Sequence, residues 1–288
     1  IPNRDLAGLA PYWQVCPGLK AQLFTPSDHP DYSRLTVETG SIKNTIFDNA
    51  EFAAFTRSVS VRFDQWRATT TPALKGISIG SHPKQLIEQI AEELLTVFND
   101  LSLIDRYDVY QHLMSYWSEV MQDDVYLIAS DGWLGTADLI PSPLIVSRYF
   151  AADQQQIEKL ETERDAISRQ MEELEEENSG EDGLFEEAKN DKGKLTKASV
   201  KARLTEIKHD RDARDERKLL TDYTALIEAE AAANKKVKDA QKSLDTKVAA
   251  TYATLTEDEV KVLVVDDKWL ATLGADVQTE LDRVSQAL

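Results

Sequence analysis

The chain contains a single cysteine, Cys16, among its 288 residues. One thiol excludes an intrachain disulfide framework and any zinc site built from several cysteines. No apolar run approaches the roughly 18 residues that a membrane-spanning helix needs. Basic residues are outnumbered by acidic ones. The chain has 33 Lys and Arg and 51 Asp and Glu, which gives a net charge of −18. This balance argues against a free-standing DNA-binding module, which is usually basic. Together with the lone cysteine, it indicates a cytoplasmic protein.

Proline is absent from the second half of the chain. All nine prolines and four of the five tryptophans lie before residue 145. Residues 151–288 consist mostly of Ala, Glu, Lys, Leu, Asp and Arg, a composition typical of long helices. We therefore predict a mainly α protein with two domains, 1–145 and 146–288. The first is a small aromatic-rich helical domain, and the second is a long antiparallel helical hairpin. Few short strands are expected.

The first domain shows short helical patterns separated by breaks. Apolar residues recur at helical spacing over residues 52–66, and Pro72 is expected to lie beyond the end of that helix. Asp105 is a candidate N-cap for a later helix. The strand candidates are residues 35–37 and the apolar run 125–128.

The second domain has a clearer pattern. A seam with alternating spacings of three and four residues, typical of coiled coils, is formed by Ile157, Leu160, Arg164, Ile167, Met171 and Leu174. It stops at residues 178–183, which are rich in Gly and polar residues. Thr196 is expected to cap a short helix, and a long helix is predicted over residues 212–253. The seam is too short for a sustained parallel dimer, so an antiparallel hairpin is the better interpretation.

The last segment is predicted to carry an interface. Thr256 and Glu259 form a capping box that starts a helix, and Asp266 or Asp267 is expected to cap the next one. The final helix then presents an apolar face made of Leu273, Val277, Leu281, Val284 and Leu288. This face has no obvious internal partner and continues to the last residue. We therefore expect a partner interface here, and interpret the chain as part of a longer protein that does not begin at its own Met.

No group of reactive side chains indicates an enzyme active site. Cys16 lies in an apolar stretch, so a buried inert thiol is favoured over a nucleophile paired with one of the four histidines. Those histidines are widely separated and lack metal-ligand spacing, and His112 is expected to pack in the core. The carboxylate pairs 123–124 and 266–267 are interpreted as capping and solvated residues.

One region has a positive local charge. Five cations and one carboxylate lie between residues 53 and 87, and Trp66 and three threonines are interleaved with them. The cations are Arg57, Arg62, Arg67, Lys75 and Lys84. A contact with the DNA backbone is one interpretation of this strip, because such contacts use Lys and Arg without reading bases. A solvated helix face is the other.

Short segments, in order along the chain, carry a resemblance. In the first half they are Tyr12-Trp13-Gln14-Val15-Cys16-Pro17, Leu74-Lys75-Gly76-Ile77, His82-Pro83-Lys84, Tyr107-Asp108-Val109-Tyr110-Gln111-His112-Leu113-Met114 and Met121-Gln122-Asp123-Asp124. In the second half they are Arg148-Tyr149-Phe150-Ala151-Ala152, Ala188-Lys189-Asn190-Asp191-Lys192-Gly193-Lys194 and Val264-Val265-Asp266-Asp267-Lys268-Trp269-Leu270. Together they resemble the region downstream of the catalytic domain in the modification subunit of type I restriction-modification systems.

The resemblance implies a subunit of an adenine-N6 DNA methyltransferase that uses S-adenosylmethionine. Its implied partners are a specificity subunit that reads double-stranded DNA and a restriction subunit for cleavage. The family's Asn/Asp-Pro-Pro-Tyr/Phe tetrapeptide and its Gly-rich cofactor motif are both absent. We therefore assign no catalytic, cofactor-binding or metal-binding residue, and expect this chain alone to be inactive and to serve in assembly. The alternative is a free-standing helical scaffold unrelated to DNA.

Overall fold

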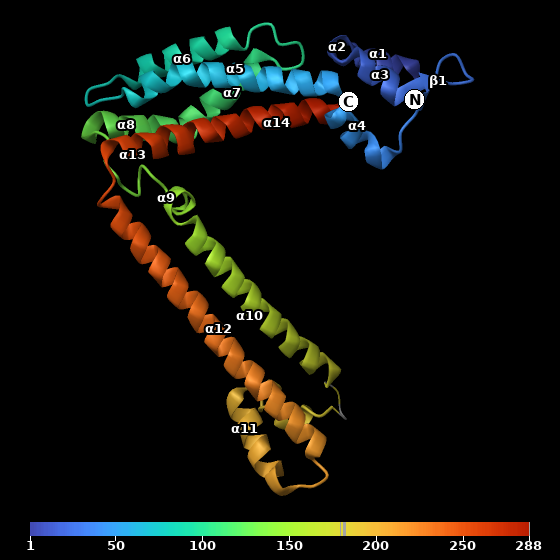
Figure 1. Ribbon diagram of the computed structural model, residues 1–288, viewed down its shortest axis with the longest axis vertical. Helices are drawn as coiled ribbons and strands as arrows, with labels where there is room; N and C mark the ends of the chain where they lie inside the picture. The colour runs from blue at the N-terminus through green and yellow to red at the C-terminus, as the bar shows by residue number, and fades with distance from the viewer. Residues whose placement is uncertain (179, 181–182, 288) are drawn as a thin grey trace. The chain divides into compact units, whose positions relative to one another are not determined.

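The computed structural model describes residues 1–178, 180 and 183–287 (Figure 1). Two compact units divide the chain: unit 1 comprises Ile1–Leu144 and Thr254–Leu288, and unit 2 comprises Ile145–Ala253. The mainly α fold is confirmed. Within the described residues, the one sheet is an antiparallel hairpin of β1 (Phe24–Pro26) and β2 (Ser33–Leu35). The expected strand at 35–37 therefore overlaps β2 only at Leu35.

Unit 1 is built on four helices that follow a group of short N-terminal elements. The short elements are α1 (Asn3–Gly8), α2 (Ala10–Val15), α3 (Pro17–Leu23), the hairpin, η1 (Thr39–Ser41) and α4 (Ile42–Asp48). The larger helices are α5 (Ala50–Lys75), α6 (Pro83–Val97), α7 (Arg106–Tyr116) and α8 (Gln122–Asp131), with the π-helical turn η2 (Trp117–Met121) between the last two. The core combines buried aromatic side chains of α5 and η2, among them Phe52, Trp66 and Trp117, with buried aliphatic side chains of α6, α7 and α8.

Local sequence signals explain most of these boundaries. Asn49 caps α5 by accepting hydrogen bonds from two backbone amides, and Asp105 caps α7 through the amide of Tyr107, as predicted. Contrary to expectation, Pro72 does not lie beyond the helix: α5 includes it and continues to Lys75, with one backbone hydrogen bond missing in its last turn. The predicted strand 125–128 is wrong. Those residues lie in α8, where Val125 and Ile128 are buried at helical spacing.

The C-terminal segment corrects the predicted domain boundary. It forms α13 (Glu257–Lys261), the π-helical segment η5 (Val262–Leu270) and α14 (Ala271–Ala287), and it belongs to unit 1 instead of the hairpin. The capping box of Thr256 and Glu259 is confirmed. Asp266 and Asp267 do not cap a helix, because the helical path continues through them into α14.

The apolar face of α14 is buried inside unit 1. Leu273, Val277, Leu281 and Val284 are each at most 5% exposed, and α14 packs on α4, α5 and α7 (Figure 1). A Cβ at Gly274 would lie 3.2 Å from a ring carbon of Phe63, so glycine allows this close approach. The expectation that these four residues dock a partner is therefore wrong. Leu288, the fifth residue of that face, lies outside the described residues.

Unit 2 is an antiparallel helical hairpin, as predicted. After α9 (Ser142–Tyr149), it consists of α10 (Ala151–Glu177), η3 (Glu186–Ala188), α11 (Lys197–Glu206), η4 (Ile207–His209) and α12 (Arg214–Tyr252). Ser168 of α10 donates to Glu230 of α12 at 2.6 Å, and Asp153 of α10 binds Lys247 of α12 at 2.5 Å. The earlier residue of α10 thus pairs with the later residue of α12, so the two helices are antiparallel. Thr196 caps α11 through a capping box with Ser199. The short helix α11 packs against α12 (Figure 1).

Burial of the α14 face leads to a stability prediction. Leu281→Asp is expected to lower the free energy of unfolding of the chain by about 3 kcal/mol or more, because a charge would be buried without a partner. Gln278→Asp, an exposed position on the same helix, is the control and should cost little. Denaturant unfolding followed by circular dichroism measures both. Equal, small losses would contradict the burial of this face.

Candidate functional site

The five predicted DNA-backbone residues have different surroundings, and Arg62 is the one of the four on α5 that faces away from the others. Along α5, Arg62 lies about 140° around the helix from Arg57, whereas Arg67 lies about 80° from Arg57 on the other side and Lys75 lies in line with Arg57. Arg62 donates from Nη1 to the carbonyl oxygens of Val97 and Asn99, both at 2.7 Å, and so satisfies the end of α6. The guanidinium of Arg62 is therefore held by hydrogen bonds within unit 1.

The remaining four cations of the strip differ in their partners. Arg67 and Lys75 both face Asp266, with nitrogen–oxygen distances of 3.8 and 2.6 Å. Lys84 is exposed and lies 3.8 Å from Glu88 on its own helix. Arg57 is exposed on α5. Three of the five cations thus bind groups of unit 1, and the contact of this strip with a DNA backbone stays a prediction.

A buried polar cluster joins α8 to η5. Lys268 donates from Nζ to Asp124 at 2.6 Å and to the carbonyl oxygen of Leu139 at 2.9 Å. The same carboxylate oxygen of Asp124 accepts the indole N–H of Trp269 at 2.8 Å. The side chains of Lys268 and Asp124 are 11% and 7% exposed. Since each charge is paired and hydrogen-bonded, the cluster can exist in the core.

The π-helical geometry of η5 lets neighbouring residues reach different partners. Its wider turn keeps Val264 and Val265 buried together with Trp269, while Asp266 reaches Lys75 and Lys268 reaches Asp124. Asp124 was expected to be a solvated capping residue, and the structure corrects this. The local sequence carries no signal for the pair, because Asp124 and Lys268 are 144 positions apart.

Two other candidate reactive groups are held in structural roles. Cys16 is fully buried, as predicted, and burial, aided by the negative charge of Glu51, raises the pKa of its thiol to about 11. The thiol is therefore protonated at neutral pH. His112 is only partly buried, and its Nε2 lies 2.9 Å from Oε1 of Glu280. Within the described residues, no group of three or more His, Cys, Asp or Glu side chains could hold a metal ion.

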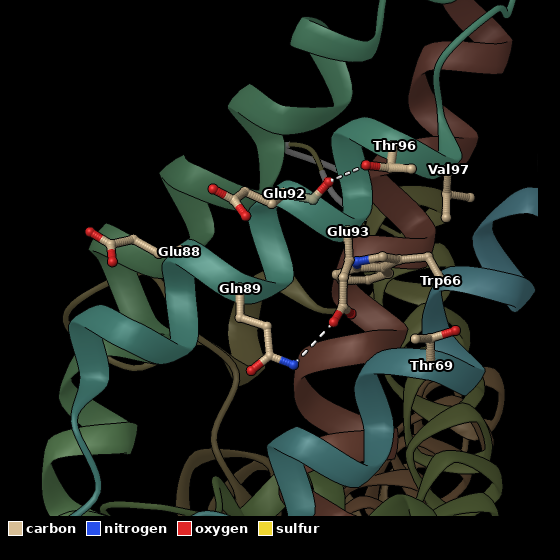
Figure 2. A pocket seen from close by; sticks show the side chains of 8 residues that line it. All are labelled: Trp66, Thr69, Glu88, Gln89, Glu92, Glu93, Thr96 and Val97. Atoms are coloured by element: carbon tan, nitrogen blue, oxygen red, sulfur yellow. Dashed lines mark hydrogen bonds between the residues drawn. The ribbon is translucent and has the colours of Figure 1, made fainter.

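An open groove of about 640 Å³ lies between α5 and α6 (Figure 2). Its carboxylates come from Glu88, Glu92 and Glu93, and Trp66 of α5 also lines it. Glu93 is occupied by hydrogen bonds from Gln89 and from the buried Thr70. Figure 2 shows the carboxylates of Glu88 and Glu92 directed away from Trp66. The groove therefore lacks converging groups.

The hairpin of unit 2 is unevenly buried along its length. One end is closed by a core that includes Phe185, Val200, Ile207, Leu220 and Tyr223. At the other end Ile157, Leu244 and Val248 are buried. Between these ends lies the central seam, which consists of Leu160, Arg164 and Ile167 of α10 and Ala233, Val237 and Ala240 of α12, all half-buried. Two helices alone leave this seam partly open.

The Asp124–Lys268 pair predicts a double-mutant result. Asp124→Leu or Lys268→Met alone should each cost about 3–5 kcal/mol of unfolding free energy, because each leaves a buried charge without its partner. The double variant should lose clearly less than the sum of the two single losses. Denaturant unfolding of the four proteins measures this coupling. Additive losses would show that the two charges do not stabilise one another.

Two carboxyls of α14 predict opposite pH effects. Burial raises the pKa of Glu280, but hydrogen bonds from His112 and Arg283 outweigh it and leave this pKa below its ordinary value of 4.5. Burial and, to a lesser degree, Glu119 raise the pKa of Asp276 above its ordinary 3.8, although His112 opposes the shift. Glu280 therefore stabilises the fold above pH 4.5 and loses this effect as the pH falls. Asp276 favours the fold below pH 3.8 and loses this effect as the pH rises.

Removing each titration should therefore change the pH profile in opposite directions. Glu280→Gln should weaken the loss of stability on acidification below pH 4.5. Asp276→Asn should weaken the loss of stability as the pH rises above 3.8. The measurement is the unfolding free energy of each variant and the parent from about pH 3 to about pH 7. Parallel profiles for all three proteins would contradict the assigned shifts.

Within the described residues, no helix combines the length and apolar character needed to cross a membrane. Comparison with known protein families, with curated proteins and with solved structures gives no match for this chain. Its function must therefore be argued from its own contacts, charges and exposed surfaces.

Proposed function

We propose that this chain is the assembly module of a type I modification subunit, a cytoplasmic protein, and that its hairpin binds a helix of the specificity subunit. The half-buried central seam carries the proposal. A partner helix laid along the seam would bury the apolar parts of Leu160, Ile167 and Val237, which α10 and α12 leave half exposed. Recognition of an amphipathic helix by such a groove is a recurring mode of binding.

The composition of the seam suits helix packing. Ala233 and Ala240 are small, so the backbone of a third helix can approach α12 closely. Arg164 pairs with Asp165 of its own helix at 2.7 Å, so a polar residue lies in the middle of an otherwise apolar seam. A single polar residue at such a position specifies register and partner at some cost in stability.

The contacts of unit 1 are compatible with the same proposal. Three segments that carry the resemblance, 74–77, 121–124 and 264–270, meet through Lys75–Asp266 and Asp124–Lys268. If these residues are common to this chain and the family that it resembles, their contacts indicate that they stabilise the fold and do not take part in a reaction. The implied assembly would also include the restriction subunit and double-stranded DNA.

The described residues do not fit the implied cofactor, S-adenosylmethionine. Nucleotide-type cofactors bind at strand-to-helix turns of parallel sheets, whereas β1 and β2 form a small antiparallel hairpin. The groove in Figure 2 is open and lined by carboxylates. We therefore propose no cofactor site in this chain, and methyl transfer would be carried out elsewhere in the subunit.

The assembly proposal predicts an effect of a single charge in the seam. Ala233→Glu should weaken binding to the specificity subunit encoded with this chain at least tenfold, because complex formation would bury the carboxylate. Thermal stability of the free chain should change little, because residue 233 remains partly exposed there. Ala231→Glu is the matched control, since Ala231 is exposed about 160° around the helix from Ala233.

Quantitative pull-down with the specificity subunit, together with thermal unfolding of the free variants, tests the proposal. Selective loss with Ala233→Glu supports docking at the central seam. Equal binding by both variants would show that the partner does not occupy the seam. Absence of binding by the unmodified chain would contradict the assembly function itself.

A further inference from the structure

Exposed residues border the half-buried central seam on one side of the hairpin. Leu160 and Ile167 of α10 and Ala233 and Ala240 of α12 line the seam on this side. At about 100° per residue, the neighbouring positions on the outer edges of the two helices are Gln156, Glu163 and Gln170 on α10 and Ala229, Lys236 and Ser243 on α12. These six residues are all exposed and are here called the rim positions.

The two helices present these rows on the same side and at matching levels. Residues seven positions apart share one place on the surface of a helix in a coiled coil. Asp153 therefore lies in the row of Leu160 on α10. Lys247 lies in the row of Ala240 on α12. Asp153 and Lys247 are 2.5 Å apart, so the two rows lie on the same side of the antiparallel hairpin.

Two of the six rim positions are charged, and their charges are opposite. Glu163 lies 10 residues beyond Asp153, and Lys236 lies 11 residues before Lys247. Glu163 and Lys236 are therefore level to within about 1.5 Å along the helix axis. Neither forms an ion pair with a described residue. This side of the hairpin thus has a negative edge and a positive edge around an apolar centre, a pattern that is complementary to itself.

We propose that a second copy of this chain covers the central seam while no partner helix is bound there. A two-fold axis parallel to the helices places α10 of each copy against α12 of the other and keeps the levels of the residues unchanged. Glu163 of one copy then meets Lys236 of the other, and the same contact occurs twice. The four helices enclose Leu160, Ile167 and Val237 in one core, as in a four-helix bundle.

The charges of the hairpin favour this arrangement over the other two-fold arrangement of facing hairpins. With an axis perpendicular to the helices, α10 would lie on the α10 of the second copy, and this helix has ten Asp and Glu but only three Lys and Arg. The complementary pattern ends at Glu177 and Asp222, which occupy the next places on the two edges and are both acidic. That end of the hairpin is closed by its own core, so the contact between copies is confined to the central seam.

The second copy acts as a cover that the assembling partner has to displace. This regulatory role rests on the proposed function, because the specificity subunit is assigned to the same seam. The contact between copies does not rest on it, since it follows from the seam and the rim positions alone. Two chains that cover one another keep their apolar seams away from water until the partner is present.

The test exchanges the two rim charges in the full chain. The variants are Glu163→Lys, Lys236→Glu and the chain that carries both changes. Lys235→Glu is the control, because Lys235 is exposed about 100° around α12 from Lys236, on the side away from α10. Sedimentation equilibrium measures the dimer dissociation constant of each protein. Thermal unfolding at low concentration checks that all of them fold alike.

We expect the unmodified chain and the control to form dimers of equal affinity. Each single rim variant should raise the dissociation constant at least tenfold, because the symmetry places two contacts between like charges in the interface. The double variant should recover most of this loss, since opposite charges meet again at both contacts. A chain that stays monomeric, a dimer that is insensitive to the single changes, or a double variant that dimerises no better than the single ones would overturn the proposal.

Titration with the specificity subunit encoded with this chain separates this proposal from the assembly function. At chain concentrations above the dimer dissociation constant, both single rim variants should form the complex at lower concentrations of the subunit than the unmodified chain does, because less dimer has to be displaced. Equal concentrations for all variants would overturn the covering role. If the subunit binds a chain that never dimerises, only the present proposal fails. If the chain dimerises as expected and the subunit does not bind, only the assembly function fails.

Discussion

The buried ion pair between Asp124 and Lys268 is the contact on which the arrangement of unit 1 depends. It joins α8 to a segment 144 positions later in the chain, and Trp269 shares the same carboxylate. A buried charge is tolerated only when it is paired, so each residue requires the other. This mutual requirement specifies where η5 must lie. Once η5 is placed, α14 follows directly and lays its apolar face on α4, α5 and α7.

The hairpin of unit 2 is stabilised at its two ends more than in its middle. Its two ends are closed by buried clusters, whereas the central seam relies on small and half-exposed side chains. A pair of helices has too little facing surface to bury a seam on all sides, so helical hairpins gain stability at their ends or from a third helix. The uneven burial separates the part of the hairpin that maintains its fold from the part that remains able to bind.

Basic side chains also differ in whether they are used within the fold. In unit 1, Arg62 is bound to two carbonyl oxygens, and Arg67 and Lys75 share the carboxylate of Asp266. In unit 2, Arg203 binds Glu216 and joins α11 to α12, while the neighbouring Lys201 and Lys208 are exposed. A local excess of basic residues therefore has two different meanings. The tertiary partners of each residue decide whether it contributes to folding or remains exposed to solvent.

The sequence by itself determined the features that depend on neighbouring residues. Helical periodicity, the caps at Asp105, Thr196 and Thr256, the hairpin and the burial of Cys16 all follow from local patterns and composition. Those patterns act through backbone hydrogen bonds and side-chain spacing within a few residues. The tertiary structure alone decided that residues 254–288 return to unit 1 and that Asp124 pairs with Lys268. It also decided that the face around Leu281 is buried. A carboxylate or an apolar stripe shows that a partner is needed, but only packing between distant segments determines which partner it has.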